Sequence, residues 1–532
     1  MDVTEIPRIQ HDFPPEPEEA RKVRLERLDQ IKAEFIHAWT GYKEHAWLKD
    51  EVAPISGDSR DTLGGWAATL VDSLDTLWIM DLKADFEDAV AAVNAIDFST
   101  CTLSELNVFE ATTRHLGGLL SAYDVSDGQY PTLLQKAWEL GHMLYAAFDT
   151  PNRMPVTRWN FRDAADGKPQ EASDAALSAE MGSLTLEFTR LSQLTGDLRF
   201  FDAAQRVMDV FDEQQNRTRL PGMWPVAVNA RDLDFTAWNS FTIGGMADSL
   251  YEYLPKQHAL LGGATPQYRK LFETAAAPMK QHLFYTPTIP GDNDNNNNHQ
   301  ILMPGDVSTD EASGVHRDPR NQHLSCFAGG MFALAGKLFD DPDDVDVGRR
   351  LTEGCLWAYE ISANGVMPET MYTLPCDGGD GAEEGGCAWD EERWLRAVEE
   401  QARLEEGEDA AAAVDANAVV QEKHLGRGVT KISDARYVLR PEAIESIFVL
   451  HRITGDESLR ERAWTMFANI VRLTRTAVAH AGLDDCGVAD DEPPKSDRME
   501  SFWPGGTLKY FYLLFSEPGA ECDDLKKNMI EQ

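Results

Sequence analysis

Residues 63–90 read LGGWAATLVDSLDTLWIMDLKADFEDAV, and they set the expectation for the whole fold. Apolar residues recur at intervals of three and four, as at Val71, Leu74 and Trp78. This spacing places them on one face of an α-helix. Alternating apolar and polar runs, which are typical of strands, are few and short in the rest of the chain. The sequence therefore predicts an all-α protein.

Similar stripes continue along the chain, and turn signals such as LTGD at 194–197 and ITGD at 453–456 separate the helices into pairs. Further helices are expected at 108–123, 132–148, 177–193, 199–212, 241–254, 267–283, 323–338, 347–360, 437–453, 459–474 and 499–515.

A weaker regularity concerns acidic residues on these helices. An acid followed by serine and an apolar residue occurs in VDSL at 71–74, ADSL at 247–250, IESI at 444–447 and MESF at 499–502. Glu110, Glu180 and Asp248 follow one another at steps of about 70 residues, which is room for one helix pair with its loops. A closed ring of helix pairs would aim these carboxylates at one central cavity.

The composition limits the partners. The chain has 532 residues, with 90 Asp and Glu against 49 Lys and Arg, and a formal net charge of −41. A surface of this sign repels phosphate backbones, so the composition predicts no nucleic-acid partner, whereas cations and neutral sugars are compatible with it. With 42% hydrophobic residues, the chain can bury one very large core or two medium ones.

The cellular compartment is left open by the residues themselves. No run approaches the roughly 18 apolar residues that a membrane-spanning helix requires, and residues 1–30 lack the apolar core of a signal peptide. The protein is therefore expected either to be cytosolic or to have a targeting segment that is missing from this chain. Seven cysteines are too few for a disulfide scaffold in a chain of this length.

Three acidic positions are candidates for chemistry. Glu110 and Arg114 are four residues apart on one helix face, so this carboxyl either forms an ordinary ion pair or is held ready to donate a proton. Glu442 follows Pro441 at a helix start, where the dipole suits an ionised general base and equally a helix-stabilising acid. Asp248 follows glycines that let a ligand approach the backbone, although an aspartate there is also a common helix cap.

Several acids that face one cavity suit glycoside cleavage, in which one acid protonates the leaving oxygen and another activates water. The sequence has no Gly-x-Ser-x-Gly elbow, no Cys/His metal spacing and no phosphate-binding glycine loop. A hard cation held by carboxylates, hydroxyls and carbonyls is compatible with the residues present.

Five segments resemble the signature motifs of glycoside hydrolase family 47, the class I α-1,2-mannosidases, including the fungal ER/Golgi-type and ER-degradation-enhancing members. The match runs in order from about residue 36 to 515. The segments are GGWAATLVDSLDTL at 64–77, NVFEATTRHLGG at 107–118, ADSLYEYL at 247–254, YVLRPE at 437–442 and MESF at 499–502.

The resemblance implies an (α/α)7 barrel of paired helices as the catalytic domain over residues 36–515. Residues 1–35 are then an N-terminal extension and residues 516–532 an atypical C-terminal tail. Residues 286–320 and 374–420 interrupt the barrel as insertions. Because neither insertion has the apolar content to pack, both are expected to be mobile loops.

The resemblance also implies an inverting glycosidase that removes α-1,2-linked mannose from high-mannose N-glycans, with calcium at the floor of its cavity. Glu110 resembles the general acid of the family, Asp248 matches a second candidate acid, and Glu442 matches the proposed general base. The positions that match the lining of the sugar subsite are Arg114, Glu180, His323, Leu324, Arg440, Glu445, Glu500 and Phe502.

Cys326 and Cys355 match the disulfide pair of the family, which favours an oxidising compartment. The resemblance therefore predicts a protein of the endoplasmic reticulum or Golgi lumen, or a secreted one, that acts on glycoproteins. A monomer is expected.

The C-terminal part departs from the family pattern. Residues 503–506 read WPGG, so that Gly506 stands where an acidic residue is expected, and Pro504 with two glycines weakens the helix. The family binds calcium through a threonine near its end, and residues 516–532 contain no match for it, so the metal ligands are unknown. Two functions are compatible with this pattern: an active mannosidase, and a catalytically impaired relative that binds glycans in glycoprotein quality control.

Overall fold

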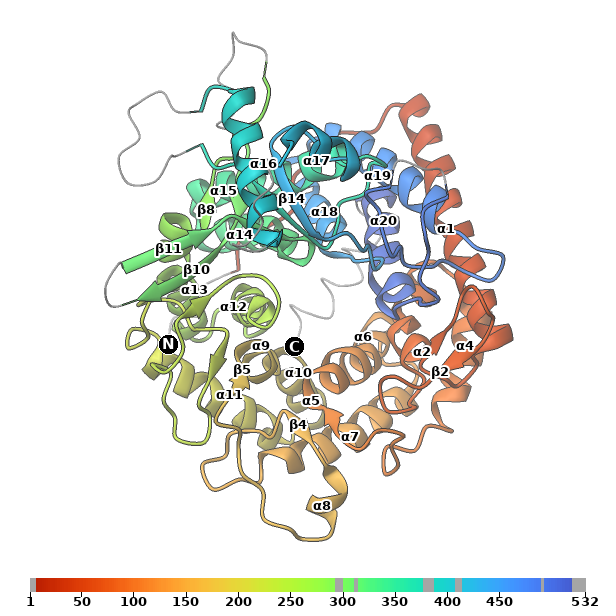
Figure 1. Cartoon of the computed structure of the whole chain (residues 1–532). Helices are drawn as coiled ribbons and strands as arrows, with labels where there is room; N and C mark the ends of the chain where they lie inside the picture. Colours follow the sequence, from red (N-terminus) through yellow and green to blue (C-terminus); the bar gives the residue numbers. More distant parts are fainter. Residues whose placement is uncertain are drawn as a thin grey trace.

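In the computed structural model, helices follow one another around a ring (Figure 1). The structure describes residues 6–291, 300–310, 314–376, 387–406, 414–488 and 492–518. Each inner helix contacts the next, and α20 together with the π-helix η6 (Trp503–Thr507) returns to α3, which closes the ring. The inner helices are α3 (Leu74–Ile79), α6 (Gly117–Val125), α10 (Thr185–Thr195), α12 (Asp248–Leu260), α14 (Phe327–Phe339), α18 (Glu442–Thr454) and α20 (Leu508–Phe515).

An outer helix packs against each inner one. In the order of their inner partners, the outer helices are α4 (Lys83–Val93), α7 (Pro131–Tyr145), α11 (Leu198–Gln214), α13 (Gln267–Pro278), α15 (Pro342–Ile361), α19 (Ser458–Thr474) and α1 (Glu18–His45), the last of which packs on α20. These seven pairs among the described residues confirm the (α/α)7 barrel. In the same parts of the chain, none of the helices is both long and apolar enough to cross a bilayer.

Glycines let some of these helices approach closely. A Cβ atom on Gly329 of α14 would lie 2.4 Å from Thr352 Oγ1, and one on Gly348 of α15 would lie 2.5 Å from the Ala333 nitrogen. On its other side, α14 meets α18, where the Ser446 hydroxyl accepts a hydrogen bond from the Gly330 N–H at 2.8 Å. Because only glycine leaves this space, the sequence fixes the distance between α14 and its two neighbours.

The predicted helices are confirmed, although several start later than expected; the one expected from residue 499 becomes helical at η6. The stripe expected from residue 241 becomes helical only at Asp248, and the one expected from 437 only at Glu442. In the first case β7 (Ser240–Phe241) and two glycines come before the helix. In the second, Leu439 adopts a left-handed backbone conformation (φ 67°) and Pro441 starts the helix. Both starts place an acid at the first position of an inner helix.

Short strands lead into the acid-bearing helices. β3 (Leu106–Asn107), β5 (Ala176–Leu177), β7, β12 (Arg320–Gln322) and β14 (Val429–Asp434) precede Glu110, Glu180, Asp248, His323 and Glu442 respectively. They pair with neighbours of similar length, so that each strand-to-helix junction is held by backbone hydrogen bonds. The partners are β4 (Arg158–Trp159), β6 (Ala227–Val228), β10 (Asp306–Asp310) and, for both β12 and β14, β13 (Thr370–Thr373).

The N-terminal boundary differs from the expectation of an extension over residues 1–35. Helix α1 begins at Glu18 and runs through that boundary to His45. Ile31 and Phe35 are completely buried. Residues 18–35 are therefore part of the barrel, because their apolar positions complete the core beside α20. Of the atypical tail over 516–532, residues 519–532 lie outside the described residues.

The expectation that both insertions are mobile loops is wrong for their described residues. Within 286–320, β10 pairs antiparallel with β11 (Gly314–Asp318) and with β7. Within 374–420, α16 (Glu391–Glu406) contacts α17 (Ala416–Glu422) and β14. Trp394 and Val398 of α16 are buried, and the Trp394 indole donates to the Val429 carbonyl at 2.8 Å. A few apolar side chains, with Trp394 and Val398 buried, dock a helix whose overall composition is polar.

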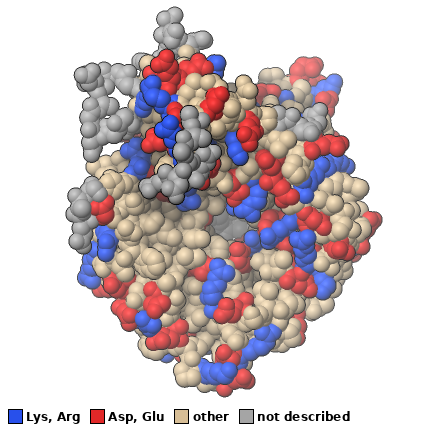
Figure 2. Space-filling model, in the orientation of Figure 1, with Lys and Arg blue, Asp and Glu red and all other residues tan. Residues whose placement is uncertain are grey.

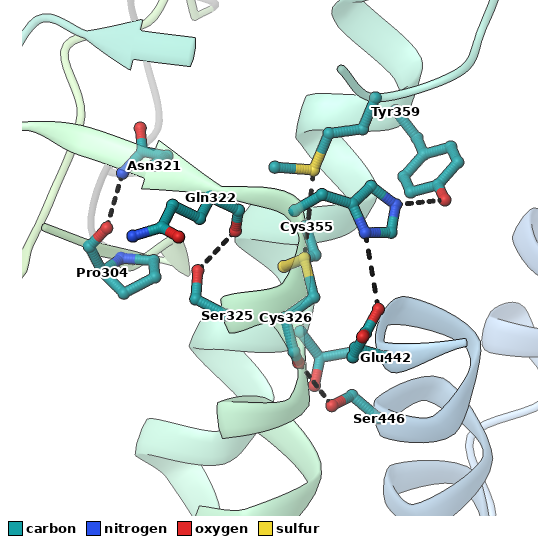
Figure 3. The surroundings of a disulfide bond; sticks show 12 residues. Pro304, Asn321, Gln322, Ser325, Cys326, Cys355, Tyr359, Glu442 and Ser446 are labelled. Carbon is teal, nitrogen blue, oxygen red and sulfur yellow. Dashed lines mark hydrogen bonds and ion pairs between the residues drawn. A yellow bond between two sulfur atoms is a disulfide. The ribbon is translucent and has the colours of Figure 1, made fainter. Parts of the chain in front are cut away.

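A disulfide joins Cys326 and Cys355, the pair that the family resemblance implies. It connects the 3-10 helix η5 (His323–Cys326) to α15, beside Glu442 at the start of α18 (Figure 3). A second disulfide, Cys376–Cys387, was not expected.

Replacing Cys326 and Cys355 together by serine is expected to lower the free energy of unfolding by about 2–4 kcal/mol, because the closed loop no longer restricts the unfolded chain. Urea unfolding measures the change. Cys101→Ser removes a cysteine that is not disulfide-bonded and serves as the matched control. If the double variant were as stable as the control, the disulfide would not stabilise the fold.

Candidate active site

The starts of the inner helices bring the predicted acids to one end of the barrel. Glu110 ends the short helix α5 (Val108–Glu110), Glu180 lies in α9 (Ser178–Gly182), and Asp248 and Glu442 begin α12 and α18. Figure 2 shows the face that Figure 1 presents; acidic and basic side chains are spread over its right and lower parts, and the area left of its centre is largely uncharged.

Arg114 organises the first group of site residues. It lies in the π-helix η1 (Ala111–Leu116), and its Nε donates to Glu110 Oε2 at 2.7 Å. Its Nη1 lies 3.4 Å from Glu500 Oε2, and its Cζ lies 5.3 Å from the centre of the Phe502 ring. The arginine therefore joins Glu110 to two residues that follow in sequence almost four hundred positions later. Glu110 is ion-paired, which is the first of the two states that its spacing allowed.

Ser501 and Asp72, which the sequence did not identify as site residues, position Arg114 through hydrogen bonds. Arg114 Nη1 donates to the Ser501 hydroxyl at 2.9 Å, and Ser501 donates to Asp72 Oδ2 at 2.6 Å. Burial raises the pKa of Asp72, although the charge of Arg114 acts to lower it. Both residues lie in the acid–serine motifs of the sequence, but their pairing across the ring could not be predicted from spacing.

Glu442 lies among cationic and hydrogen-bonding groups. Its Oε2 is 3.7 Å from His323 Nδ1, and its Oε1 is 3.6 Å from Arg440 Nη1. His323 Nε2 is in turn bonded to the Tyr359 hydroxyl at 2.7 Å, which orients the ring. Burial acts to raise the pKa of Glu442, but His323 and Arg440 outweigh it and hold this pKa below its ordinary value. Glu442 is therefore an ionised carboxylate at neutral pH.

Arg440 is itself held by a residue that was not predicted. Its Nε donates to both carboxylate oxygens of Glu369 at 2.8 Å. Glu369 directly precedes β13, and no helical periodicity marks it. This bidentate pair fixes the guanidinium beside Glu442.

The pKa of Asp248 is shifted in the opposite direction from that of Glu442. Burial raises the pKa of Asp248 to about 7, and the negative charges of Glu252 and Glu442 add to this effect. The N–H of Ser249 donates to its Oδ1 at 2.9 Å. Asp248 therefore holds a proton up to about neutral pH, whereas Glu442 does not.

The other predicted positions surround the same centre. Lys256 Nζ lies 3.1 Å from Glu445 Oε1 and 2.6 Å from Glu252 Oε1, and the Tyr510 hydroxyl donates to Glu445 at 3.0 Å. Glu180 accepts from the Asn107 amide at 3.2 Å and pairs with Arg158. Leu324 follows His323 in η5, near the glycines that precede Asp248.

These contacts form one electrostatic cluster. The pKa of Asp248 responds to Glu442, and that of Arg440 responds to both Glu442 and Glu500. Glu500 meets Arg114, which holds Glu110. Because each link requires proximity, the structure brings together the three predicted catalytic acids and does not scatter them over the outside.

The acidic, histidine and cysteine side chains of the described residues do not form a metal site by themselves. They include no group of three or more that could hold a metal ion. The acids that face one another are instead engaged by cations: Glu110 and Glu500 by Arg114, and Glu369 by Arg440. No step of the reaction is therefore assigned to a metal.

Comparisons with known proteins identify the family of the chain. The family model of Glycosyl hydrolase family 47 matches residues 34–528. The chain is 31% identical to mannosyl-oligosaccharide alpha-1,2-mannosidase 1B of Emericella nidulans, over 92% of this chain and 88% of that protein. It is 30% identical to the endoplasmic reticulum mannosyl-oligosaccharide 1,2-alpha-mannosidase of Rattus norvegicus, over 92% of this chain and 65% of that one. Among solved structures, the alpha-1,2-mannosidase of Trichoderma reesei superimposes with a TM-score of 0.77 at 27% identity, over 93% and 94% of the two chains.

Proposed function

Because the chain belongs to glycosyl hydrolase family 47, we propose that its central site hydrolyses α-1,2-linked mannose from high-mannose N-glycans with inversion at the anomeric carbon. The observation that carries this proposal is that the pKa values of two nearby carboxyls, Glu442 and Asp248, are shifted in opposite directions. The pKa of Glu442 is held low and that of Asp248 is raised to about 7. A pair of carboxyls whose pKa values are pushed apart supplies the base and the acid of a glycosidase.

The reaction is a single displacement. Glu442, ionised and steadied by His323 and Arg440, takes a proton from the attacking water. As the water oxygen bonds to the anomeric carbon, the bond to the leaving oxygen breaks and that oxygen receives a proton from Asp248. Glu110 is paired with Arg114 and orients a water molecule beside the leaving group. Inversion follows, because one attack occurs from the opposite face of the sugar.

Residues that the resemblance assigns to the sugar subsite complete the proposal. Phe502 offers an apolar ring, while Glu445 and Glu500 accept hydrogen bonds from sugar hydroxyls. Glu180, His323, Leu324, Arg114 and Arg440 shape the rest of the subsite.

Asp248 makes the reaction pH-dependent. We expect kcat/KM to fall as the pH rises through about 7, because Asp248 must carry its proton to donate it and loses that proton above its pKa. The acidic limb lies at low pH, because the depressed pKa of Glu442 keeps the base ionised. A pH profile of mannose release tests this. A rate that is constant from about pH 6 to about pH 9 would contradict the assignment of Asp248.

The wider setting is part of the same proposal. The protein acts as a monomer on high-mannose N-glycans of glycoproteins in the secretory pathway, the setting named for the rat relative. Its two disulfides support an oxidising compartment. Calcium, which the resemblance implies, is part of this proposal, although clustered acidic, histidine and cysteine side chains of the described residues do not supply its ligands. A higher melting temperature in calcium than in chelator is expected if the protein binds it.

The decisive experiment is release of mannose from a high-mannose oligosaccharide, followed by NMR of the anomer first formed. Release of the β-anomer is expected. Binding without release would instead support the impaired glycan-binding relative.

A further inference from the structure

A buried acid, Glu51, lies beside the site without a role in the reaction. It belongs to β1 (Glu51–Val52), which pairs with β2 (Ser59–Arg60). Its side chain is completely buried, and neither carboxylate oxygen accepts a hydrogen bond from the described residues. Burial, and then the charge of Glu500, raise the pKa of Glu51 to about 7. A carboxyl in this position is costly, so its surroundings require an explanation.

The neighbouring residue holds Glu51 in this place. Asp50 accepts hydrogen bonds from the N–H groups of Leu63, Gly65 and Trp66 at 2.7, 2.8 and 2.9 Å. These hydrogen bonds anchor Asp50 to the loop before α2 (Ala68–Asp72). Because successive side chains of an extended chain point to opposite sides, the Glu51 side chain points away from this loop.

Arg498 is the cation that meets Glu51. Its Nε lies 3.6 Å from Glu51 Oε2, and its Nη2 lies 3.0 Å from Glu500 Oε1. The other oxygen of Glu500 faces Arg114 at 3.4 Å. Glu500 is thus held between two arginines, one on each oxygen. Arg498 is half-exposed, and the segment that carries it is anchored because Asp497 accepts from the Ile55 N–H at 2.7 Å.

We propose that Arg498 is a positioning residue of the sugar subsite: by bridging the carboxylates of Glu51 and Glu500, it holds Glu500 against Arg114. The contacts form a row of alternating charge that runs from Glu51 through Arg498, Glu500 and Arg114 to Glu110. Without Arg498, two adjacent carboxylates repel each other and Glu500 turns away from its place. This inference rests on the proposed function, since it concerns the same site.

The charged groups around this bridge come from several elements. The charges that act on Glu51 are those of Glu500 and Arg498, which lie in the segment before η6, and that of Arg114, which lies in η1. Glu500 also acts on Arg440, which precedes α18. Because Arg498 lowers the pKa of Glu51, its removal raises that pKa further. Glu51 is then neutral in acid and charged in alkali.

The test compares Arg498→Met, Arg498→Lys and the double variant Arg498→Met/Glu51→Gln. At about pH 8, where Glu51 is charged, Arg498→Met is expected to raise KM for a high-mannose oligosaccharide by about tenfold with kcat within about threefold of the wild type at the same pH, since the base and the acid are untouched. Arg498→Lys is expected to retain most of the affinity. The double variant is expected to recover to within about threefold of the wild type, because the neutral amide that replaces the Glu51 carboxylate no longer repels Glu500. An arginine with a merely structural role would not be rescued by removing this carboxylate.

A pH series gives an independent readout. The ratio of the KM values of Arg498→Met and the wild type is expected to be smaller at about pH 5.5 than at about pH 8, because protonation of Glu51 imitates the Glu51→Gln change. Arg206→Met, which breaks an exposed pair with Asp202 on α11, is the matched control for loss of a surface arginine. An unchanged KM in Arg498→Met, or a double variant as weak as the single one, overturns the inference.

Melting temperatures identify a variant that fails to fold, and Arg498→Lys then carries the test through its own pH series. Calorimetric binding of the same oligosaccharide separates the two proposals. If the wild type binds it but releases no mannose, the proposed function fails, whereas a weaker binding of Arg498→Met with recovery in the double variant still supports the bridge.

Discussion

Glu442→Gln is expected to lower kcat for mannose release by about 10³-fold while the glycan affinity changes by less than about threefold. The variant keeps the shape of the side chain and removes the group that takes the proton of the attacking water. His323 and Arg440 lie 3.7 and 3.6 Å from the Glu442 oxygens and leave them ionised in the wild type. Because Arg440 balances the Glu442 charge before and during the reaction, loss of that charge affects the chemical step more than binding.

The measurement is single-turnover release of mannose from the oligosaccharide, with calorimetric binding of the same ligand. Glu461→Gln is the matched control, because Glu461 pairs with Arg27 on the outer helix α19 and is largely exposed. A Glu442→Gln variant with more than about a tenth of the wild-type kcat would remove Glu442 from the mechanism.

Asp248→Asn is expected to lower kcat on the oligosaccharide by about 10²–10³-fold, and to lower it by less than about tenfold on α-mannosyl fluoride. The reason is the leaving group: an alkoxide needs a proton as it departs, whereas fluoride does not. The basic limb near pH 7 should vanish from the fluoride profile of the wild type for the same reason. Glu442→Gln loses both activities, since water must be activated in either case.

Glu110→Gln separates the two candidate acids. Glu110 is ion-paired with Arg114 at 2.7 Å, whereas Asp248 holds a proton, so Asp248→Asn should be the more damaging change on the oligosaccharide. The reverse order, with α-mannosyl fluoride activity spared only in Glu110→Gln, would assign proton donation to Glu110 through water.

The sequence allowed much of the fold to be predicted, because inner helices such as α14 carry their apolar residues at regular helical spacing. It failed at α16, where a sparse set of apolar residues with Trp394 and Val398 at its centre docks a polar segment, and at α1, whose charged first turns precede the buried Ile31 and Phe35. Local periodicity reports on one face of one helix. It does not report where a sparse set of apolar residues finds its partner.

The candidate site shows the same division. Glu110, Asp248 and Glu442 could be proposed from motifs, because each lies in a distinctive segment. Asp72, Glu369 and Glu51 could not, since their roles depend on contacts between residues far apart in sequence, such as Arg440 with Glu369. The protonation states were also beyond the sequence: spacing left both states open at Glu110, and burial by neighbouring helices produced the high pKa of Asp248.

The contact between α1 and α20 has a consequence for biosynthesis. Helix α1 leaves the ribosome first among the described helices, and its partner α20 leaves last. Until α20 is synthesised, Phe35 and its apolar neighbours lack the surface that buries them in the folded protein. Glu51 likewise lacks Arg498 and Glu500. Until then, the nascent chain must therefore keep an incomplete toroid soluble, which makes it a natural client for chaperones.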